Sequence, residues 1–259
     1  MGGVKKEKII EFFDKMSIDR NLHLVGSPIL KYEQETRQRA VVELLEPKHG
    51  DKILDVGCGN ARDILVYLKT EADCVGIDFS ISMVLEGRKE LAKKDLESPL
   101  LVGDATKLPF KNGVFDKVCC SEVIEHIPDY ERAIIELVRV LKKGGKIVIT
   151  TPNKSSMYAT NKLYSFVVTK IKRKSGHPFD EWKTEKEIVE VLADNGIKIE
   201  KKVGICFLPG VFAYKSPKAL KNIIVKITSN IEKRVRWKLH THGYMLGISG
   251  IKQSERIHF

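Results

Sequence analysis

Two acidic residues and a glycine turn form the most informative pattern in the sequence. The stretch Asp55-Val-Gly57-Cys58-Gly59-Asn60-Ala61 follows a short apolar run, and Asp78 ends a second apolar run 23 residues after Asp55. A buried strand, a glycine turn and a later acid at a strand end are the parts of a nucleotide-type site. The glycines let the backbone approach a ligand closely, and Asp78 is placed to accept hydrogen bonds from both hydroxyls of a ribose.

The same turn argues against a dinucleotide ligand. The fingerprint Gly-x-Gly-x-x-Gly needs a third glycine, and Arg62 stands at that position. Without a small residue there, the N-terminus of the helix cannot close on a pyrophosphate. Asp55, two residues before Gly57, instead suits a ligand that carries an amino group.

The turn resembles the first motif of the class I S-adenosylmethionine (SAM)-dependent methyltransferases, Asp-x-Gly-x-Gly-x-Gly, with Ala61 in place of the last glycine. Leu108–Asp116 and Arg139–Gly145 extend the resemblance to the type 11 methyltransferase domain, the ubiquinone/menaquinone methyltransferase-like group. The resemblance covers residues 50–150 well and 184–205 loosely. It implies SAM as the cofactor.

The resemblance also implies which residues hold SAM. The glycine turn would hold the methionine portion with Asp55 close to its amino group, Phe79 would stack on the adenine, and Asp104 would face the adenine amino group. The predicted cofactor-binding residues are Asp55, Gly57, Cys58, Gly59, Asn60, Asp78, Phe79, Met83, Asp104, Ala105, Ser121 and Glu122. The alternatives are an ordinary strand-to-helix turn and, for Asp104, a loop acid or helix cap.

A second motif, Ser121–Asp129, follows the fourth expected strand and would face the sulfonium. His126 is its candidate general base, because an imidazole with an unperturbed pKa of about 6.5 suits deprotonation of a hydroxyl near neutral pH. The alternatives are that His126 packs or caps locally and that positioning and desolvation suffice, since SAM already carries an activated methyl group. His177–Lys183 either touches the substrate or anchors a loop by burying Phe179 and Trp182.

Alternating strands and helices must position these residues. Strands are predicted at 52–56, 73–78, 99–102, 116–121, 146–150, 197–205 and 244–252, and helices at 4–16, 33–46, 60–69, 82–94, 130–141 and 184–195, with Gly144-Gly145 as a helix stop. Such alternation with short connections predicts a mostly parallel sheet covered on both faces. Together with the resemblance, it gives a Rossmann-like, doubly wound α/β fold with seven strands, the last of them antiparallel, plus helical cap insertions.

The chain is expected to form a single methyltransferase domain over residues 1–259. Its parts are N-terminal helices (1–49), a SAM-binding core (50–150), basic cap insertions (151–183 and 207–241) and the rest of the core (184–206 and 242–259). Ser216 and Pro217 are predicted to begin a helix in the second insertion.

Charge is distributed unevenly along the chain. The net charge is +11, with −1 in residues 1–150 and +12 in residues 151–259. The two insertions carry +5 and +7, which together equal the whole excess of the C-terminal part. Both would leave the sheet at the carboxyl ends of strands, where ligands bind, so they are expected to form a basic, amphipathic cap over the active site.

The basic segments leave three interpretations open: solvated helix faces, recognition of an anionic or membrane-bound substrate, and RNA binding. No RNA-binding module is visible, so the favoured acceptor is a small, amphipathic or anionic molecule resembling a quinone, a lipid or a lipid-linked sugar. O-methylation is preferred because hydroxyl acceptors are common in the resembled group. A tRNA or rRNA methyltransferase and a catalytically inactive SAM-binding regulator are the alternatives.

Composition limits the compartment and the partners. No apolar run approaches the roughly 18–20 residues needed to span a bilayer, and the N-terminus lacks the apolar stretch of a secretory signal. Five cysteines without metal-ligand spacing predict reduced thiols and no metal. The expected location is cytoplasmic, with peripheral contact to an anionic membrane surface as an open option.

Overall fold

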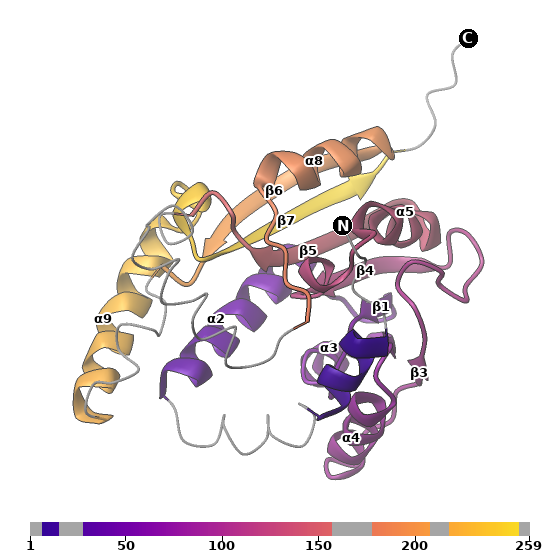
Figure 1. Cartoon of the computed structure of the whole chain (residues 1–259), viewed down its shortest axis with the longest axis horizontal. Helices are drawn as coiled ribbons and strands as arrows, with labels where there is room; N and C mark the ends of the chain where they lie inside the picture. The colour runs from indigo at the N-terminus through magenta and orange to yellow at the C-terminus, as the bar shows by residue number, and fades with distance from the viewer. Residues whose placement is uncertain (1–6, 16–27, 157–177, 208–217, 254–259) are drawn as a thin grey trace.

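The computed structural model describes residues 7–15, 28–156, 178–207 and 218–253 (Figure 1). A helix at residues 7–15 comes first. The elements that follow are α2 (Pro28–Leu45), β1 (Lys52–Val56), α3 (Ile64–Tyr67), η1 (Leu68–Thr70), β2 (Asp73–Asp78), α4 (Ile81–Ala92), β3 (Leu100–Val102), β4 (Phe115–Ser121), η2 (Ile124–His126), α5 (Tyr130–Val140), β5 (Leu141–Pro152), α8 (Glu185–Asp194), β6 (Ile197–Ile205), α9 (Lys218–Val235), η3 (His240–His242) and β7 (Met245–Lys252).

One seven-stranded sheet forms the centre of the molecule, in the order β3-β2-β1-β4-β5-β7-β6 (Figure 1). Neighbouring strands from β3 to β5 are parallel, whereas β7 runs antiparallel to both β5 and β6. The predicted doubly wound fold with an antiparallel last strand is confirmed. Because β1, β2 and β4 are parallel, their carboxyl ends meet at one edge of the sheet.

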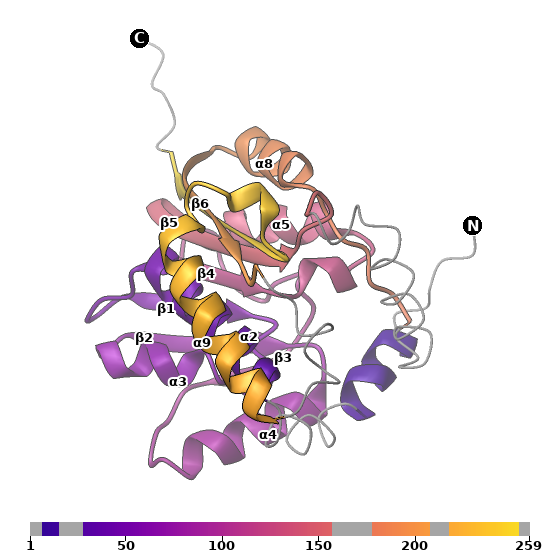
Figure 2. The same cartoon turned by 90° about the vertical axis from the view of Figure 1, so that its left-hand side faces the viewer.

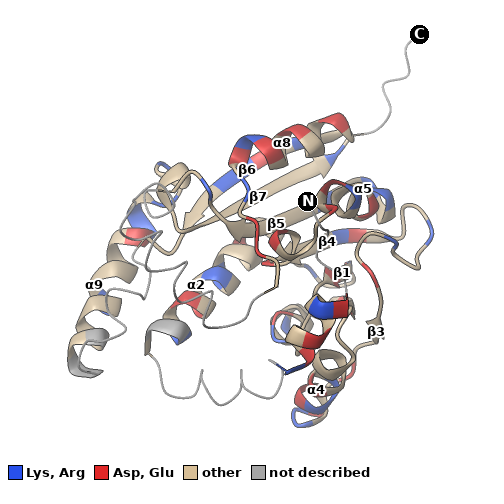
Figure 3. Ribbon diagram, in the orientation of Figure 1, with Lys and Arg blue, Asp and Glu red and all other residues tan. Residues whose placement is uncertain are grey.

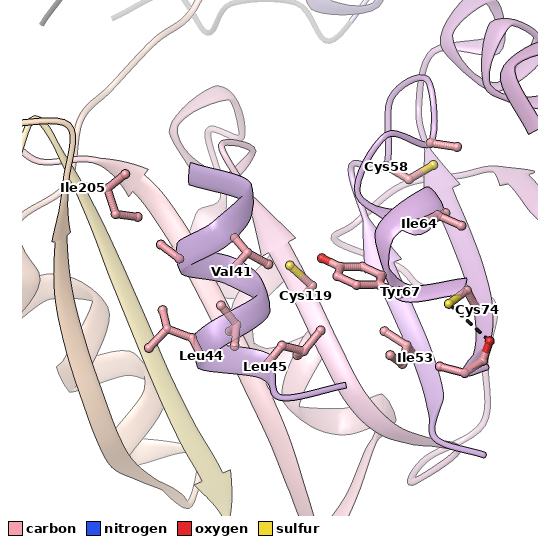
Figure 4. Close-up of a cluster of buried hydrophobic side chains, with 14 of the residues drawn as sticks. Val41, Leu44, Leu45, Ile53, Cys58, Ile64, Tyr67, Cys74, Cys119 and Ile205 are labelled. Atoms are coloured by element: carbon pink, nitrogen blue, oxygen red, sulfur yellow. Dashed lines mark hydrogen bonds between the residues drawn. The ribbon is translucent and has the colours of Figure 1, made fainter. Parts of the chain in front are cut away.

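Each face of the sheet is covered by its own set of helices. On one face Val41, Leu44 and Leu45 of α2 pack with residues of α3 and α4, as Figure 4 shows for α2 and α3. On the other face lie α5 and α8. Adjacent strand residues point to opposite faces, so Cys119 belongs to the first core and Cys120 to the second.

Local signals in the sequence set several helix beginnings. The Thr184 hydroxyl accepts the backbone N–H of Glu187 at 3.2 Å, and the Glu187 carboxylate accepts the Thr184 N–H at 2.7 Å. This reciprocal pair is the predicted capping box of α8. Ser80 caps α4 by a single hydrogen bond, in which its hydroxyl accepts the N–H of Met83.

The structure corrects three predicted boundaries. Gly144 and Gly145 do not stop α5: the helix ends at Val140, and both glycines lie within β5, where its pairing with β4 shifts register. The helix expected from residue 60 begins at Ile64, since Ala61 still belongs to the turn with φ +61°. Helix α2 begins at Pro28, five residues before the predicted start. The predicted cap at Ser216 and Pro217 lies outside the described residues.

None of the helices in the described ranges combines the length and apolarity needed to cross a membrane.

An acid-sensitive ionic cluster ties α2 to the sheet. Glu46 follows α2, and its carboxylate accepts hydrogen bonds from Lys201 of β6 at 2.5 Å and Lys146 of β5 at 2.9 Å. These bonds lower the pKa of Glu46 from 4.5 to about 2. A carboxylate whose folded pKa is depressed stabilises the fold above its unfolded pKa, and the contribution disappears as the pH falls toward the folded value.

We therefore predict that Glu46→Gln lowers the free energy of unfolding at pH 6, by less than about 1 kcal/mol because the group is partly exposed. The difference from the parent should shrink as the pH falls from 5 toward 2. Urea unfolding at a series of pH values measures it, with Glu97→Gln at an exposed position as the control. A pH-independent difference would contradict the assignment.

Candidate functional site

A cavity of about 800 Å³ lies at the carboxyl ends of β1, β2 and β4. All twelve predicted cofactor-binding residues and His126 line it. The structure therefore brings together residues that are spread over about 70 positions of the chain, from Asp55 to His126.

The glycine turn after β1 has the tight geometry that the sequence suggested. Gly57 has φ +73°, and a Cβ there would lie 2.2 Å from a methyl carbon of Val123. Its N–H donates to the Ile77 carbonyl at 2.7 Å. Gly59 has φ +51° with open space where a Cβ would point. Gly57 is thus required by packing and torsion together, while Gly59 is required by torsion alone.

Asp78 at the end of β2 is buried and held by the backbone. Its two carboxylate oxygens accept the N–H groups of Gly59 and Ser80, each at 2.9 Å. These two backbone bonds fix the orientation of the Asp78 carboxylate at the cavity, which Asp78 lines.

Asp55 is buried beside other carboxylates. Burial raises its pKa well above the usual value, the neighbouring Asp63 and Asp78 raise it further, and Arg37 opposes them. Without a ligand this carboxyl therefore holds its proton more tightly than an exposed one. A cationic ligand group beside it would restore the charged form.

Arg37 of α2 enters the site from the N-terminal part of the chain. Its guanidinium forms two bonds with the Asp63 carboxylate, at 2.7 and 3.2 Å, and a third with the Ser121 hydroxyl. Burial disfavours this cation, but Asp63 outweighs burial and the pKa of Arg37 is raised. Neither Arg37 nor Asp63 was predicted from the sequence, because they are 26 residues apart and belong to no local motif.

Asp104 fits both interpretations offered for it. Its carboxylate accepts the N–H of Thr106 at 2.9 Å, which is the local bond expected of a loop acid. Asp104 and Ala105 also line the cavity.

His126 lies between protein acceptors. Its Nδ1 is 3.3 Å from the Phe179 carbonyl oxygen, and its Nε2 is 3.6 Å from a carboxylate oxygen of Glu125. Burial raises the pKa of Glu125 well above its usual value, and Glu122 adds to the effect. His126 therefore packs locally and also lines the cavity, so its position fits both interpretations offered for it.

The helix at residues 7–15 covers part of the cavity. Ile9 and Phe13 line it, and the Phe13 ring stands edge-on to Phe79 and to His126, with ring centroids 5.4 and 5.1 Å apart. Asp14 accepts the Ser80 hydroxyl and, at 3.3 Å, the Ser82 N–H. The apolar stripe predicted this helix, but nothing in the sequence predicted its place over the site.

The motif His177–Lys183 contributes two of its residues to the cavity. Asp180 and Trp182 line it, and the Trp182 ring packs against Tyr244 with centroids 5.4 Å apart. The described part of this segment therefore lies at the cavity, where the interpretation that it touches the substrate requires it to be. His177 lies outside the described residues.

The expected basic cap is not what the described walls show. No residue of the described part of α9 lines the cavity, because α9 packs along α2 instead. The walls are acidic: the carboxylates are Glu33, Asp55, Asp63, Asp78, Asp104, Glu122, Glu125, Asp129 and Asp180, against the guanidinium groups of Arg37 and Arg62. Residues 157–177 of the first insertion lie outside the described residues.

Among the described residues, no group of three His, Cys, Asp or Glu side chains could hold a metal ion.

Sequence comparison relates the chain to known methyltransferases. Residues 54–149 match a family model described as a methyltransferase domain. A demethylmenaquinone methyltransferase from Mycolicibacterium vanbaalenii is 32% identical over 163 residues, which is 62% of this chain and 65% of the relative. One from Bacillus cytotoxicus is 27% identical over 164 residues, 62% of this chain and 68% of the relative. The match thus spans about two thirds of the relatives' length.

Structural comparison shows the same fold. A SAM-dependent methyltransferase from Thermotoga maritima superposes with a TM-score of 0.66 at 18% identity, covering 94% of this chain and 99% of that one. Geranyl diphosphate C-methyltransferase from Streptomyces coelicolor, solved with S-adenosylhomocysteine, gives 0.61 at 15% identity over 85% and 79% of the two chains. The matched segment, the sequence relatives and the shared fold agree: the chain carries a class I SAM-dependent methyltransferase domain.

Proposed function

We propose that this protein transfers the methyl group of SAM to an uncharged, ring-bearing small molecule, with a hydroxyl oxygen as the preferred acceptor atom. The observation that carries the proposal is that all twelve predicted cofactor-binding residues line one cavity. SAM supplies an activated methyl group on a positively charged sulfur, so the protein's task is to orient the two molecules and to exclude water.

The donor set fits this cofactor. In our proposal Asp78 binds the ribose hydroxyls, Asp55 lies beside the amino group, and Asp104 with Phe79 holds the adenine. SAM carries a sulfonium and an ammonium group, and acidic walls complement both. The positive charge of Arg37, which pairs with Asp63, offsets the repulsion among the nearby carboxylates and opposes the rise in the pKa of Asp55.

The walls also restrict the acceptor. Seven acidic side chains besides Asp55 and Glu125, whose pKa values are raised, face two guanidinium groups, and this excess disfavours an anionic acceptor in the described part of the cavity, contrary to one of the options offered by the sequence. The aromatic rings of Phe13, Trp182 and Tyr244 suit a flat, apolar partner. The relatives named demethylmenaquinone methyltransferases support a quinone-type acceptor.

The decisive experiment incubates the protein with isotopically labelled SAM and either reduced quinones or a cell extract. We expect label in a small apolar molecule, with mass spectrometry locating the methylated atom.

Asp78→Ala should weaken SAM binding about 10- to 100-fold, in line with the loss of a charge-assisted hydrogen bond. Asp73→Ala, at the exposed other end of β2, should not. Label in RNA would overturn the acceptor class, and binding of SAM without turnover would indicate a regulator.

The raised pKa of Asp55 predicts that SAM binding depends on pH. If the ammonium group of SAM lies beside Asp55, binding lowers this pKa and releases a proton, so affinity should rise with pH. The increase should reach at most about tenfold per pH unit between the pKa of Asp55 in the complex and its higher pKa in the free protein. Calorimetry in buffers of different ionisation enthalpy measures the proton release. Asp55→Asn should abolish the slope while Asp73→Asn retains it; a slope that survives Asp55→Asn would place the amino group elsewhere.

The geometry of His126 predicts a modest role in the chemical step. Since Nδ1 lies 3.3 Å from the Phe179 carbonyl oxygen and Nε2 lies 3.6 Å from the buried Glu125 carboxyl group, we expect His126→Gln to lower kcat less than tenfold and to leave the pH profile of kcat unchanged. Steady-state kinetics over pH 6–9 measure both. Loss of about 10²–10⁴-fold together with loss of the pH dependence would instead make His126 the general base.

A further inference from the structure

Helix α9 is packed with its polar side inward. The side that meets α2 carries Thr228, Glu232 and Arg236, which are all buried. Glu232 accepts a hydrogen bond from the Tyr32 hydroxyl of α2 and, at 2.9 Å, the N–H of Cys206. Arg236 pairs with Glu43 of α2. Polar contacts to α2 therefore hold this helix in place, together with Val225, which is partly buried against the core.

The apolar stripe of α9 faces solvent instead. Leu220, Ile223, Ile227 and Ile231 are 45%, 56%, 55% and 52% exposed. They recur every three or four residues and so form one continuous stripe along the helix. Figures 1 and 2 show α9 at the rim of the molecule, beside α2, with its length open to the outside.

Basic residues border this stripe. Lys226, Lys233 and Arg234 are exposed on α9, and Figure 3 marks basic positions along the helix. Glu232, the acid of 207–241, is buried. Trp237 and Leu239, just beyond the helix, are 40% and 43% exposed and extend the apolar surface.

Charge distinguishes among the occupants that could cover such a stripe. A second copy of this chain, related by two-fold symmetry, would place the same lysines and arginines against one another. Residues 157–177 of this chain have five Lys or Arg and no acid, so they would also meet the stripe with like charge. An anionic lipid surface complements both the apolar stripe and its basic border. Its headgroups attract the lysines and arginines, and its acyl chains accept the isoleucines.

We propose that the outer face of α9, formed by Leu220, Ile223, Ile227, Ile231 and their basic border, docks the protein on an anionic lipid bilayer. The face lies outside the cavity, so the proposal does not depend on methyl transfer or on the acceptor. Trp237 lies at the end of the stripe, where an indole favours the boundary between headgroups and acyl chains.

The test measures co-sedimentation of the full chain with phosphatidylglycerol–phosphatidylcholine vesicles and with pure phosphatidylcholine vesicles. We expect binding to the anionic vesicles only, weakened by salt. The variant Ile223→Ser/Ile227→Ser/Ile231→Ser should lose at least tenfold in partitioning. Ile81→Ser/Leu85→Ser, which removes apolar residues of similar exposure from α4, is the matched control and should bind like the parent.

A second pair of variants tests the charges. Lys226→Gln/Lys233→Gln/Arg234→Gln should weaken binding about fivefold for each cation removed. The control, Lys48→Gln/Lys111→Gln/Lys143→Gln, makes an equal charge change at exposed positions.

Fluorescence reports on the end of the helix. Because the chain has two tryptophans, Trp182→Phe leaves Trp237 as the sole fluorescent reporter, whose emission should shift to the blue on binding.

Three outcomes would overturn the proposal. Equal binding of the α9 variant and its control would place the docking surface elsewhere. Equal binding to neutral and anionic vesicles would remove the role of the basic border. A dimer in analytical ultracentrifugation that the Ile→Ser variant disperses would assign the face to a second copy. Circular dichroism confirms that each variant is folded, and SAM affinity is a second check for the variants of α9, α4 and the surface lysines, none of which changes a residue that lines the cavity.

Discussion

The site depends on one buried cation among carboxylates. Asp55, Asp63 and Asp78 are all buried, and burial together with the neighbouring Asp63 and Asp78 raises the pKa of Asp55 well above its usual value. Arg37 offsets this by a two-bond contact with Asp63, which is 9% exposed. The same guanidinium bonds to the Ser121 hydroxyl, so it joins α2, the start of α3 and the end of β4. Arg37 thus allows several aspartates to be buried together at the cavity of the folded protein.

Helix α2 carries three separate tasks on its different faces. Val41, Leu44 and Leu45 pack into the core against the sheet. Arg37 reaches the site, while Tyr32 and Glu43 bind α9 through polar contacts. The helix therefore connects the cavity to the outer surface on which the apolar stripe of α9 lies. This arrangement explains why α9 can leave its isoleucines outside: polar contacts to α2 already hold it.

Within the described residues, the basic insertions do not form the cavity walls. Their excess charge predicted a positive cover over the cavity, whereas the described walls are acidic and the described part of α9 packs along α2; residues 157–177 and 208–217 of the insertions lie outside the described residues. Cover comes in part from the helix at residues 7–15, whose Phe13 lies against Phe79 and His126. Charge counted along a segment says nothing about which way its helix faces, because that depends on the partner helix.

The sequence by itself determined the alternating strands and helices, the glycine turn after β1 and the capping box of α8, because apolar runs, turns and caps act over a few residues. The antiparallel last strand and the choice of residues that line the cavity were expected from the resemblance to methyltransferases, and parallel strands bring those residues to one edge of the sheet. Only the tertiary structure decided the Arg37–Asp63 pair, the place of Phe13 and the Tyr32–Glu232 bond across 200 positions. Such contacts join elements whose docking is chosen by packing, and no local spacing records it.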